Sequence, residues 1–377
     1  MSLYRESKYS EAIPLALDLL RSREERLGPD HLTVAVSLHN LAKLYSKLGE
    51  FSEAEPLFKR SLEIRRKQLG DGHPRVANAL NSLGDLYRKM GRYQEAESYY
   101  KNALAVLKKA LGPEDPIVAN TLNNLALVYY QMGQYENVES LYQKSLEIYE
   151  KTLGPDDPKV ANSLNNLAEF YRKTGDLDQA ESFYLESLHI RERVLGKNDP
   201  KVASSLNNIA GLYISKKDYA KAEVLYLKAI KIKEKTLGPD HLSVAQSLNN
   251  LAELYRKMGF SENAEPLLQR SLVIKEMSLG FGHPSVATAL NNLAGLYSSM
   301  GKYAKAEPFY TRSLVIWEKT LGPNHPNVKV ALNNLAILYR KLGDPEKAAE
   351  FLRRLKKLKE KKSAVSRETA RGISAEK

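Results

Sequence analysis

The chain contains no cysteine among its 377 residues. Disulfide frameworks, thiolate zinc sites and cysteine nucleophiles are therefore excluded. Long apolar runs are also missing, because no stretch approaches the roughly 18 apolar residues that a membrane-spanning helix needs. The first residues, MSLYRESKYSEA, lack the apolar core of a signal peptide. These absences favour a soluble, cytoplasmic protein in a reducing compartment.

Motifs for catalysis are missing as well. The sequence has no phosphate-binding G-x-x-x-x-G-K-[ST], no H-E-x-x-H metal helix and no G-x-S-x-G nucleophile turn. Carboxylates are plentiful, but they recur at solvent-facing positions and no unique pair stands out for acid-base chemistry. We therefore expect neither enzymatic activity nor a cofactor.

The formal net charge of +12 is unevenly distributed. Residues 353–377 hold ten Lys/Arg and three Glu, so +7 of the +12 lies in the last 25 residues. The stretch RRLKKLKEKK carries leucines at helical spacing, which favours a solvated terminal helix. An acidic partner, a membrane surface or RNA is the alternative, but no interleaved aromatic residues support base stacking. The pattern as a whole gives little support to nucleic-acid binding.

An internal repeat organises the sequence. A Leu-Gly pair returns every 42 residues without insertion or deletion, and such a period indicates stacked supersecondary units. The leucines of this pair are Leu27, Leu69, Leu111, Leu153, Leu195, Leu237, Leu279 and Leu321.

Each unit contains two segments of helical periodicity separated by a glycine. In the unit that starts near Pro158, the apolar residues of the first segment follow spacings of 3, 1 and 3, which predicts a helix A ending near Gly175. A helix B is predicted from about Asp176 to Leu195, where the Leu-Gly pair ends it. The sequence therefore predicts helix pairs along the whole array.

The loops between units end in Asp or His, followed in most units by a proline. His31, His73, His241, His283 and His325 occupy this position, and Asp115, Asp157 and Asp199 replace them in other units. A residue that caps a helix can be either Asp or His. The exchange would disable a metal site, so we interpret these residues as helix caps.

The pattern L-N-N-L-A-x-L-Y-x-x-x-G-x-Y-x-x-A-E-x-x-Y-x-x-S-L resembles tetratricopeptide repeats, from residue 8 to about 352. The 42-residue period and the LGPxHPxVA loops are most similar to those of kinesin light chains. The resemblance implies an all-α fold, a right-handed superhelical solenoid of helix-turn-helix repeats in which the A helices line an inner groove. Stacking would bury apolar stripes that no helix pair can bury alone.

This organisation predicts four parts of the chain. Residues 1–28 form a partial repeat, made of a helix A remnant and a helix B. Residues 29–343 form the tetratricopeptide array, residues 344–362 a terminal basic helix, and residues 363–377 a disordered tail.

The polar side of helix A is the predicted floor of a peptide-binding groove. Its first marker is an asparagine that recurs every 42 residues, at Asn81, Asn123, Asn165, Asn207, Asn249, Asn291 and Asn333. In six of these units a second asparagine follows directly, about 100° further round the helix. The amides either bridge neighbouring A helices or hold the backbone of a bound peptide, as the resemblance implies for related grooves.

The second marker has a period of 84 residues. Basic pairs stand in alternate units, at Arg88 and Lys89, Arg172 and Lys173, Arg256 and Lys257, and Arg340 and Lys341. An acidic residue precedes the first three pairs, so intrahelical ion pairs are one interpretation. Two of the intervening units carry Gly211 and Gly295, which cost helix stability and could open shallow pockets.

These features predict a scaffold for protein-protein interactions. The groove would take an extended peptide with an apolar anchor at a glycine pocket and acidic residues opposite Arg172, Arg256 or Arg340. Kinesin light chains are similar in taking acidic, tryptophan-containing cargo segments. The alternative is a regulatory or sensor arm of a larger signalling NTPase. The sequence leaves the partner and the oligomeric state open.

Overall fold

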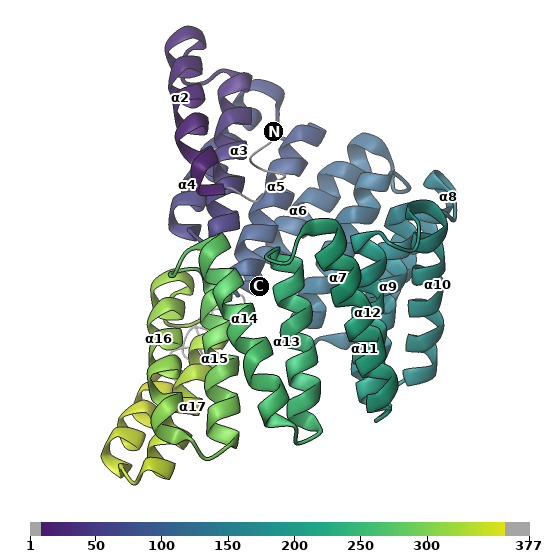
Figure 1. Cartoon of the computed structure of the whole chain (residues 1–377). Helices are drawn as coiled ribbons and strands as arrows, with labels where there is room; N and C mark the ends of the chain where they lie inside the picture. The colour runs from purple at the N-terminus through teal and green to yellow at the C-terminus, as the bar shows by residue number, and fades with distance from the viewer. Residues whose placement is uncertain (1–8, 359–377) are drawn as a thin grey trace, which may run out of the picture. The chain divides into compact units, whose positions relative to one another are not determined.

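The computed structural model describes residues 9–358, which are almost entirely helical and contain no strand. The chain divides into two units, residues 1–259 and residues 260–377 (Figure 1). No helix within residues 9–358 is both long enough and apolar enough to cross a membrane. The predicted tail at 363–377 lies outside the described residues, as do residues 1–8.

The first unit alternates B and A helices. Its A helices are α3 (Leu32–Leu48), α5 (Pro74–Lys89), α7 (Pro116–Met132), α9 (Pro158–Thr174), α11 (Pro200–Ser215) and α13 (Leu242–Lys257). Its B helices are α2 (Tyr9–Leu27), α4 (Phe51–Leu69), α6 (Tyr93–Leu111), α8 (Val138–Leu153), α10 (Leu177–Leu195) and α12 (Tyr219–Leu237), and a short 3₁₀ turn, η1 (Tyr135–Asn137), precedes α8.

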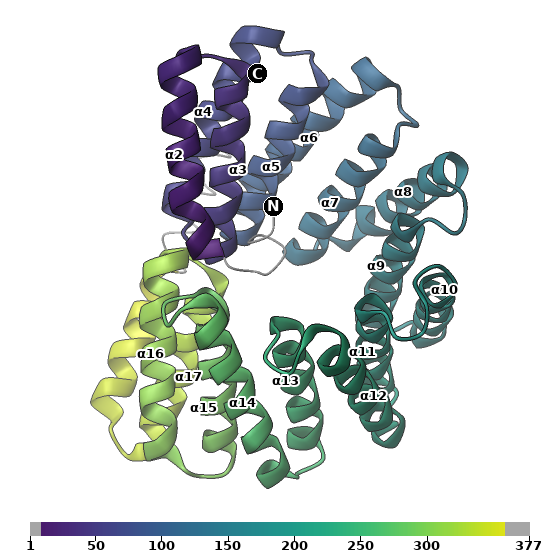
Figure 2. The same cartoon turned by 45° about the horizontal axis from the view of Figure 1, so that its top comes forward.

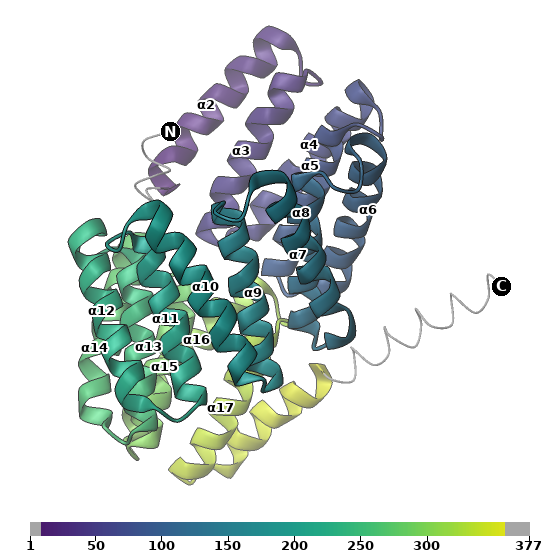
Figure 3. The same cartoon turned by 90° about the vertical axis from the view of Figure 1, so that its right-hand side faces the viewer.

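The second unit continues the same alternation. Its helices are α14 (Ser261–Leu279), α15 (Pro284–Ser299), α16 (Tyr303–Leu321) and α17 (Pro326–Leu342). Residues 345–358, which follow α17 in Figure 3, are also helical and cover the described part of the predicted basic helix.

The predicted helix ends are confirmed. The Nδ1 atom of His73 accepts a hydrogen bond from the backbone N–H of Arg75 at 3.0 Å, and an oxygen of Asp157 accepts one from Lys159 at 2.8 Å. The other His and Asp residues of this position cap their helices in the same way. Gly175 ends α9 in the left-handed conformation, with φ of 99°. The loop histidines therefore serve the backbone, as the exchange with aspartate indicates.

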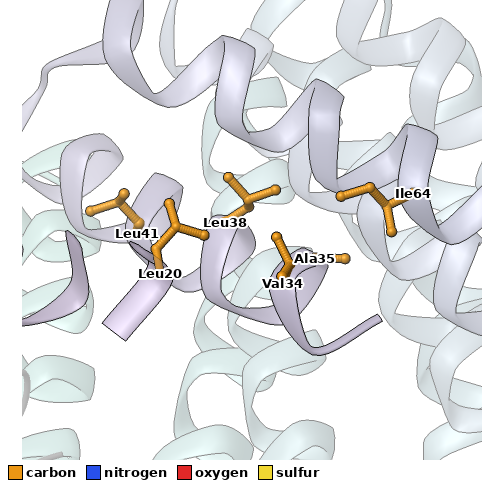
Figure 4. Close-up of a cluster of buried hydrophobic side chains, with 6 residues drawn as sticks. All are labelled: Leu20, Val34, Ala35, Leu38, Leu41 and Ile64. Carbon is orange, nitrogen blue, oxygen red and sulfur yellow. The ribbon is translucent and has the colours of Figure 1, made fainter. Parts of the chain in front are cut away.

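Within each unit consecutive helices pack along their apolar stripes, so that A helices such as α5, α9 and α15 each lie between two B helices. At the first A helix, Leu38 and Leu41 are fully buried against Leu20 of α2 and Ile64 of α4 (Figure 4). Alanines such as Ala35 have no exposed surface, which allows the helices to approach closely. The core is thus a continuous row of small clusters rather than one central mass.

The A and B helices take different sides of the first unit. In Figure 2, α9 and α11 lie on the inner side, and α10 and α12 cover them from outside. The polar faces of the A helices, which carry the asparagines, therefore follow one another along the inner side.

The B helices also bury positive charge. The ammonium of Lys233 is held by the Ser243 carbonyl at 3.3 Å and the Ser247 hydroxyl at 3.0 Å. At the next repeat Ala289 replaces the serine, and within residues 9–358 the buried Lys275 has neither a hydrogen bond nor an ion pair. Burial lowers the pKa of Lys275 to about 8. This lysine therefore destabilises the fold at neutral pH.

We expect Lys275→Met to raise the melting temperature at pH 7, because it removes a buried charge while filling a similar volume. From the shift in pKa, the gain in free energy of unfolding is at most about 3 kcal/mol. The folded pKa lies below the unfolded one, so wild-type stability should rise with pH between about 8 and 10.5, and the advantage of the variant should shrink there.

Thermal unfolding followed by circular dichroism at pH 7 and pH 10 measures this effect. Lys319→Met, at an exposed position of α16, is the matched control and should change little. A lower melting temperature for Lys275→Met at pH 7 would contradict the assignment.

Candidate ligand-binding groove

Two cavities open on the polar faces of the A helices, both within the first unit. The larger, which we name the central cavity, has a volume of about 540 Å³. It is lined by Asn165, Asn166, Glu169 and Arg172 of α9, Asn207, Asn208, Gly211, Ile214 and Ser215 of α11, Asn250 and Lys257 of α13, and by Tyr184 and Tyr226 of the B helices.

The second, which we name the lysine cavity, has a volume of about 510 Å³ and lies nearer the N-terminus. It is lined by Lys43, Ser46 and Lys47 of α3, Phe58 of α4, Asn78, Asn81, Ser82, Asp85 and Lys89 of α5, Pro116, Ile117, Asn120 and Asn124 of α7, and Lys159 of α9. Four lysines face one carboxylate, and that carboxylate is already paired with Arg88 and Lys89. The cavity therefore has a positive potential.

The asparagines form bridges between neighbouring A helices. In each bridge the second asparagine of one repeat donates its Nδ2 hydrogen to the Oδ1 of the first asparagine in the preceding repeat. The bridges are Asn166 to Asn123 at 2.9 Å, Asn208 to Asn165 at 2.6 Å and Asn334 to Asn291 at 3.0 Å. We call this set the asparagine ladder; its members reach towards both neighbouring helices, as the 100° offset indicates.

Two asparagines depart from the ladder. Asn81 donates to the hydroxyl of Thr121 at 2.8 Å, and Asn207 donates to the hydroxyl of Ser247 at 2.6 Å. The Oδ1 atoms of both are buried without a hydrogen-bond partner among the described residues. A buried acceptor that is left unpaired costs about 1–3 kcal/mol. Asn207 belongs to the lining of the central cavity and Asn81 to that of the lysine cavity, although these two oxygens are themselves buried.

Three of the four arginines in the charged repeats, Arg88, Arg172 and Arg256, are paired with carboxylates of their own helices. Arg172 binds Glu169 through two hydrogen bonds, of 2.8 and 2.6 Å, and Arg256 binds Glu253 through two of 2.7 Å. Burial opposes the ionisation of Glu169, but the hydrogen bonds from Arg172, Tyr184 and Tyr130 lower its pKa below the usual value. These guanidinium groups are thus largely neutralised before any ligand arrives.

The predicted glycine pocket lies in the central cavity. A Cβ atom built on Gly211 would meet only the Tyr226 hydroxyl, at 3.9 Å, so packing does not require glycine there. At Gly84, by contrast, a Cβ atom would lie 2.8 Å from the ring of Tyr100. The absence of a side chain at Gly211 instead leaves the Tyr226 hydroxyl open to the cavity.

Tyr226 is an unusual cavity residue. Its side chain is 4% exposed, and its hydroxyl, which borders the cavity, has no hydrogen-bond partner among the described residues. Burial raises the pKa of Tyr226 to about 12, so the hydroxyl keeps its proton and can donate it. The equivalent Tyr184 is already bound to Glu169 at 2.7 Å. Glycine in place of glutamate therefore exposes a polar group that its neighbour conceals.

The cavities bring together only part of the predicted set. Asn165, Asn207, Arg172, Lys257 and Gly211 line the central cavity, and Asn81 and Lys89 line the lysine cavity. The linings of these two cavities omit Asn123, Asn249, Arg88, Lys173 and Arg256. In the second unit, Asn333, Arg340 and Lys341 are exposed, and Asn291 belongs to the ladder. A Cβ atom built on Gly295 would lie 3.5 Å from the Tyr310 hydroxyl.

Sequence reasoning missed several lining residues. Tyr184 and Tyr226 stand at helical spacing with the apolar residues of helix B, which indicates core positions, yet both line the central cavity. The lysine cavity also contains Lys43, Lys47 and Lys159, which the repeat markers do not include. Lys47 stands 42 residues before Lys89, so it occupies the equivalent position of the preceding repeat and could have been found from the sequence.

The chain was then compared with known proteins. A search of curated proteins found no match. A family model described as tetratricopeptide repeat matches residues 1–67, 47–109, 75–151, 117–193, 159–235, 201–277 and 285–361. These overlapping segments cover nearly the whole chain.

Similar solved structures include a Rap protein complexed with competence and sporulation factor, at 18% identity and a TM-score of 0.61, covering 96% of this chain and 95% of that one. The Rap conjugation gene regulator of plasmid pLS20, solved with the Phr* peptide, has 17% identity and a TM-score of 0.56, covering 94% and 97%. A protein of Podosopora anserina, provisionally assigned as a kinesin light chain with nearly identical TPR-like repeats, has 26% identity and a TM-score of 0.45, covering 55% and 98%.

The helix pairs, the 42-residue register and the family match agree over the array. The chain belongs to the tetratricopeptide repeat family.

Proposed function

We propose that this protein is an interaction scaffold that captures an extended, acidic peptide segment along the inner side of its first unit. The observation that carries the proposal is the Tyr226 hydroxyl beside Gly211 in the central cavity, which has no hydrogen-bond partner among the described residues. Buried polar groups normally have partners, so groups left without one at a cavity point to a ligand that supplies it.

The composition of the cavity suits a peptide. Its amides and hydroxyls offer both donors and acceptors, which a peptide backbone also presents. The carboxylate of Glu169 is engaged by Arg172, Tyr184 and Tyr130, so it is poorly placed to act as a general base. One similar fold was solved with a peptide, which supports the proposal.

The acidic character of the ligand is inferred from the lysine cavity. Lys43, Lys47 and Lys159 have exposed side chains around that cavity, and Lys89 completes the set. An anionic segment would be attracted here rather than to the arginines, since Arg172 and Arg256 are paired within their own helices. The proposal therefore places the acidic residues of the ligand at these lysines, of which Lys89 belongs to the set predicted from the sequence.

The apolar anchor is assigned to the central cavity. Gly211 leaves room above Tyr226, and the side chain of Ile214 contributes an apolar surface one turn along α11. A large side chain of the ligand could lie here while the polar groups around it bind the backbone.

Neutralising the lysine cavity should weaken binding. The probe is a fluorescein-labelled peptide of about fourteen residues with four glutamates in one half and one tryptophan in the other, made in both orientations. We expect Lys43→Gln/Lys47→Gln/Lys159→Gln to lower its affinity about tenfold at low salt, from three contacts of about 0.5 kcal/mol each. Fluorescence anisotropy measures the affinity, and the loss should shrink as salt is added.

The control variant is Lys108→Gln/Lys109→Gln/Lys235→Gln, with all three lysines on B helices. Its lysines are exposed, lie outside both cavities and give the same change in net charge. Equal losses for the two triple variants would refute a lysine-specific site. A second peptide with glutamine in place of each glutamate should bind both variants and the wild type equally.

Filling the glycine pocket should separate binding from stability. Leucine already stands at the equivalent position of α7, Leu127, so Gly211→Leu is compatible with the repeat. Removing a mid-helix glycine should raise the free energy of unfolding by up to about 1 kcal/mol, and the melting temperature should rise slightly with it. The added side chain should cover the Tyr226 hydroxyl and lower the affinity for the tryptophan-containing peptide by at least about tenfold.

Gly84→Ala is the contrasting variant, because its Cβ atom would press on the Tyr100 ring and should lower the melting temperature. If Gly211→Leu binds the peptide as the wild type does, the central cavity does not hold the anchor.

A further inference from the structure

The first A helix of the array breaks the charge pattern that the charged repeats share. At the position that Glu169 and Glu253 occupy in their repeats, α3 carries Lys43. Lys47 follows four residues later, one helical turn along the same face, and α3 contains neither Asp nor Glu. The ion pair that neutralises the arginines of the charged repeats within their own helices therefore has no counterpart in α3.

A third ammonium group reaches the same place from the next A helix. Lys89 of α5 donates a hydrogen bond across to the Ser46 hydroxyl of α3, at 3.2 Å. Ser46 stands directly before Lys47 and three residues after Lys43, and all four residues line the lysine cavity. We name this group, Lys43, Ser46, Lys47 and Lys89, the α3 end of the cavity.

Two side chains of the α3 end keep hydrogens to donate. The Lys89 ammonium has three N–H groups, and among the described residues it meets two acceptors, the Ser46 hydroxyl and the Asp85 Oδ2 at 3.0 Å. The Ser46 side chain is only 9% exposed, and its hydroxyl accepts from Lys89 but donates to no acceptor within residues 9–358. The group that this end lacks is therefore an acceptor of hydrogen bonds that carries negative charge.

Asp85 is the one carboxylate in the lining of the lysine cavity. Arg88 contacts one of its oxygens at 2.7 Å and Lys89 contacts the other at 3.0 Å. Burial raises the pKa of Asp85, but the charges of Lys89 and Arg88 outweigh that effect and hold the pKa below its usual value. This single negative charge is shared by two cations, so the α3 end keeps a positive potential.

We propose that the α3 end binds a phosphorylated side chain of the captured segment, so that phosphorylation of the partner strengthens its capture. This inference rests on the proposed function and names the anionic group that the lysine cavity selects. The phosphate oxygens accept hydrogen bonds from the three ammonium groups and from the Ser46 hydroxyl.

A phosphate ester matches the α3 end better than a glutamate does. Phosphoserine carries a charge of about −1.5 to −2 and three strong acceptor oxygens, whereas glutamate carries one charge on two oxygens. Successive side chains of an extended segment point to opposite sides, so two neighbouring glutamates do not enter the same cavity together. One group with two charges meets all the donors at once, and lysine is a common ligand of phosphate.

Matched peptides test this inference with the full chain. The parent is the fluorescein-labelled peptide with four glutamates, and in each derivative phosphoserine replaces one glutamate. We expect the best of these derivatives to bind about tenfold more tightly than the parent at low salt. Fluorescence anisotropy gives both affinities, and their ratio is compared between variants because a loss of folded protein affects both peptides alike.

Lys43→Glu is the decisive variant. It restores the acid that α9 and α13 carry at this position and places it one turn before Lys47, where the two side chains form an ion pair. Lys43 is exposed, so the melting temperature should stay close to that of the wild type. We expect the ratio of affinities to fall to about one. Ser46→Ala, which removes only the hydroxyl, should lower the ratio about threefold.

Lys159→Glu is the matched control, because it makes the same change in charge in the lining of the same cavity but on α9, three A helices after α3. It should weaken the binding of both peptides and leave the ratio at about ten.

The outcomes separate this inference from the function on which it rests. Phosphoserine peptides that bind no more tightly than the parent overturn the phosphate inference, as does a ratio that Lys43→Glu leaves unchanged. Either result leaves the scaffold proposal standing where the parent peptide still binds in a lysine-dependent way. A single-stranded RNA of the same length that binds these lysines more tightly than the phosphoserine peptides also overturns the inference. Absence of binding by every peptide overturns both.

Discussion

The fold depends on the contact between each A helix and the B helix before it. A tyrosine hydroxyl of helix A donates to a glutamate 32 residues earlier, as in Tyr87 to Glu55 at 2.7 Å and Tyr213 to Glu181 at 2.7 Å. The same bond recurs in the second unit, between Tyr297 and Glu265 at 2.9 Å. Because no repeat gains or loses a residue, this bond and the buried alanines beside it repeat with the same register along each unit. Within each unit the polar faces of the A helices consequently line up on one side.

A regular scaffold lets small differences decide where a site forms. The position that is Glu169 in α9 is Leu127 in α7 and Gly211 in α11, and each choice is compatible with the packing beneath it. Glutamate covers the tyrosine below through a hydrogen bond, whereas glycine exposes it. The central cavity therefore arises from substitutions on the polar face, while the apolar stripe stays constant.

The helix pairs, their caps and the inner placement of the asparagines could be predicted from the sequence, because periodicity and capping are local properties. The role of each asparagine could not. The doublet alone does not predict that Asn207 donates to the Ser247 hydroxyl while its own Oδ1 has no partner, although Asn250 of the next A helix stands where a ladder donor is expected. The sequence also left open whether Arg172 pairs with a ligand or with its own helix. In the structure it pairs with Glu169, three residues earlier, at 2.6 Å.

The positions where this chain gives up stability are informative about its use. Gly211 weakens a helix without relieving any clash, and the oxygens of Asn81 and Asn207 are buried without partners, while most equivalent groups are satisfied. The buried Lys275 differs from these, since it faces the core and borders neither cavity. A glycine inside a helix or an unpaired polar group lowers the stability of the free protein, and a bound ligand can supply the contact that is missing. Gly211 and the Tyr226 hydroxyl beneath it meet at the central cavity, and this coincidence is the physical reason to place the ligand there rather than on the outer helices.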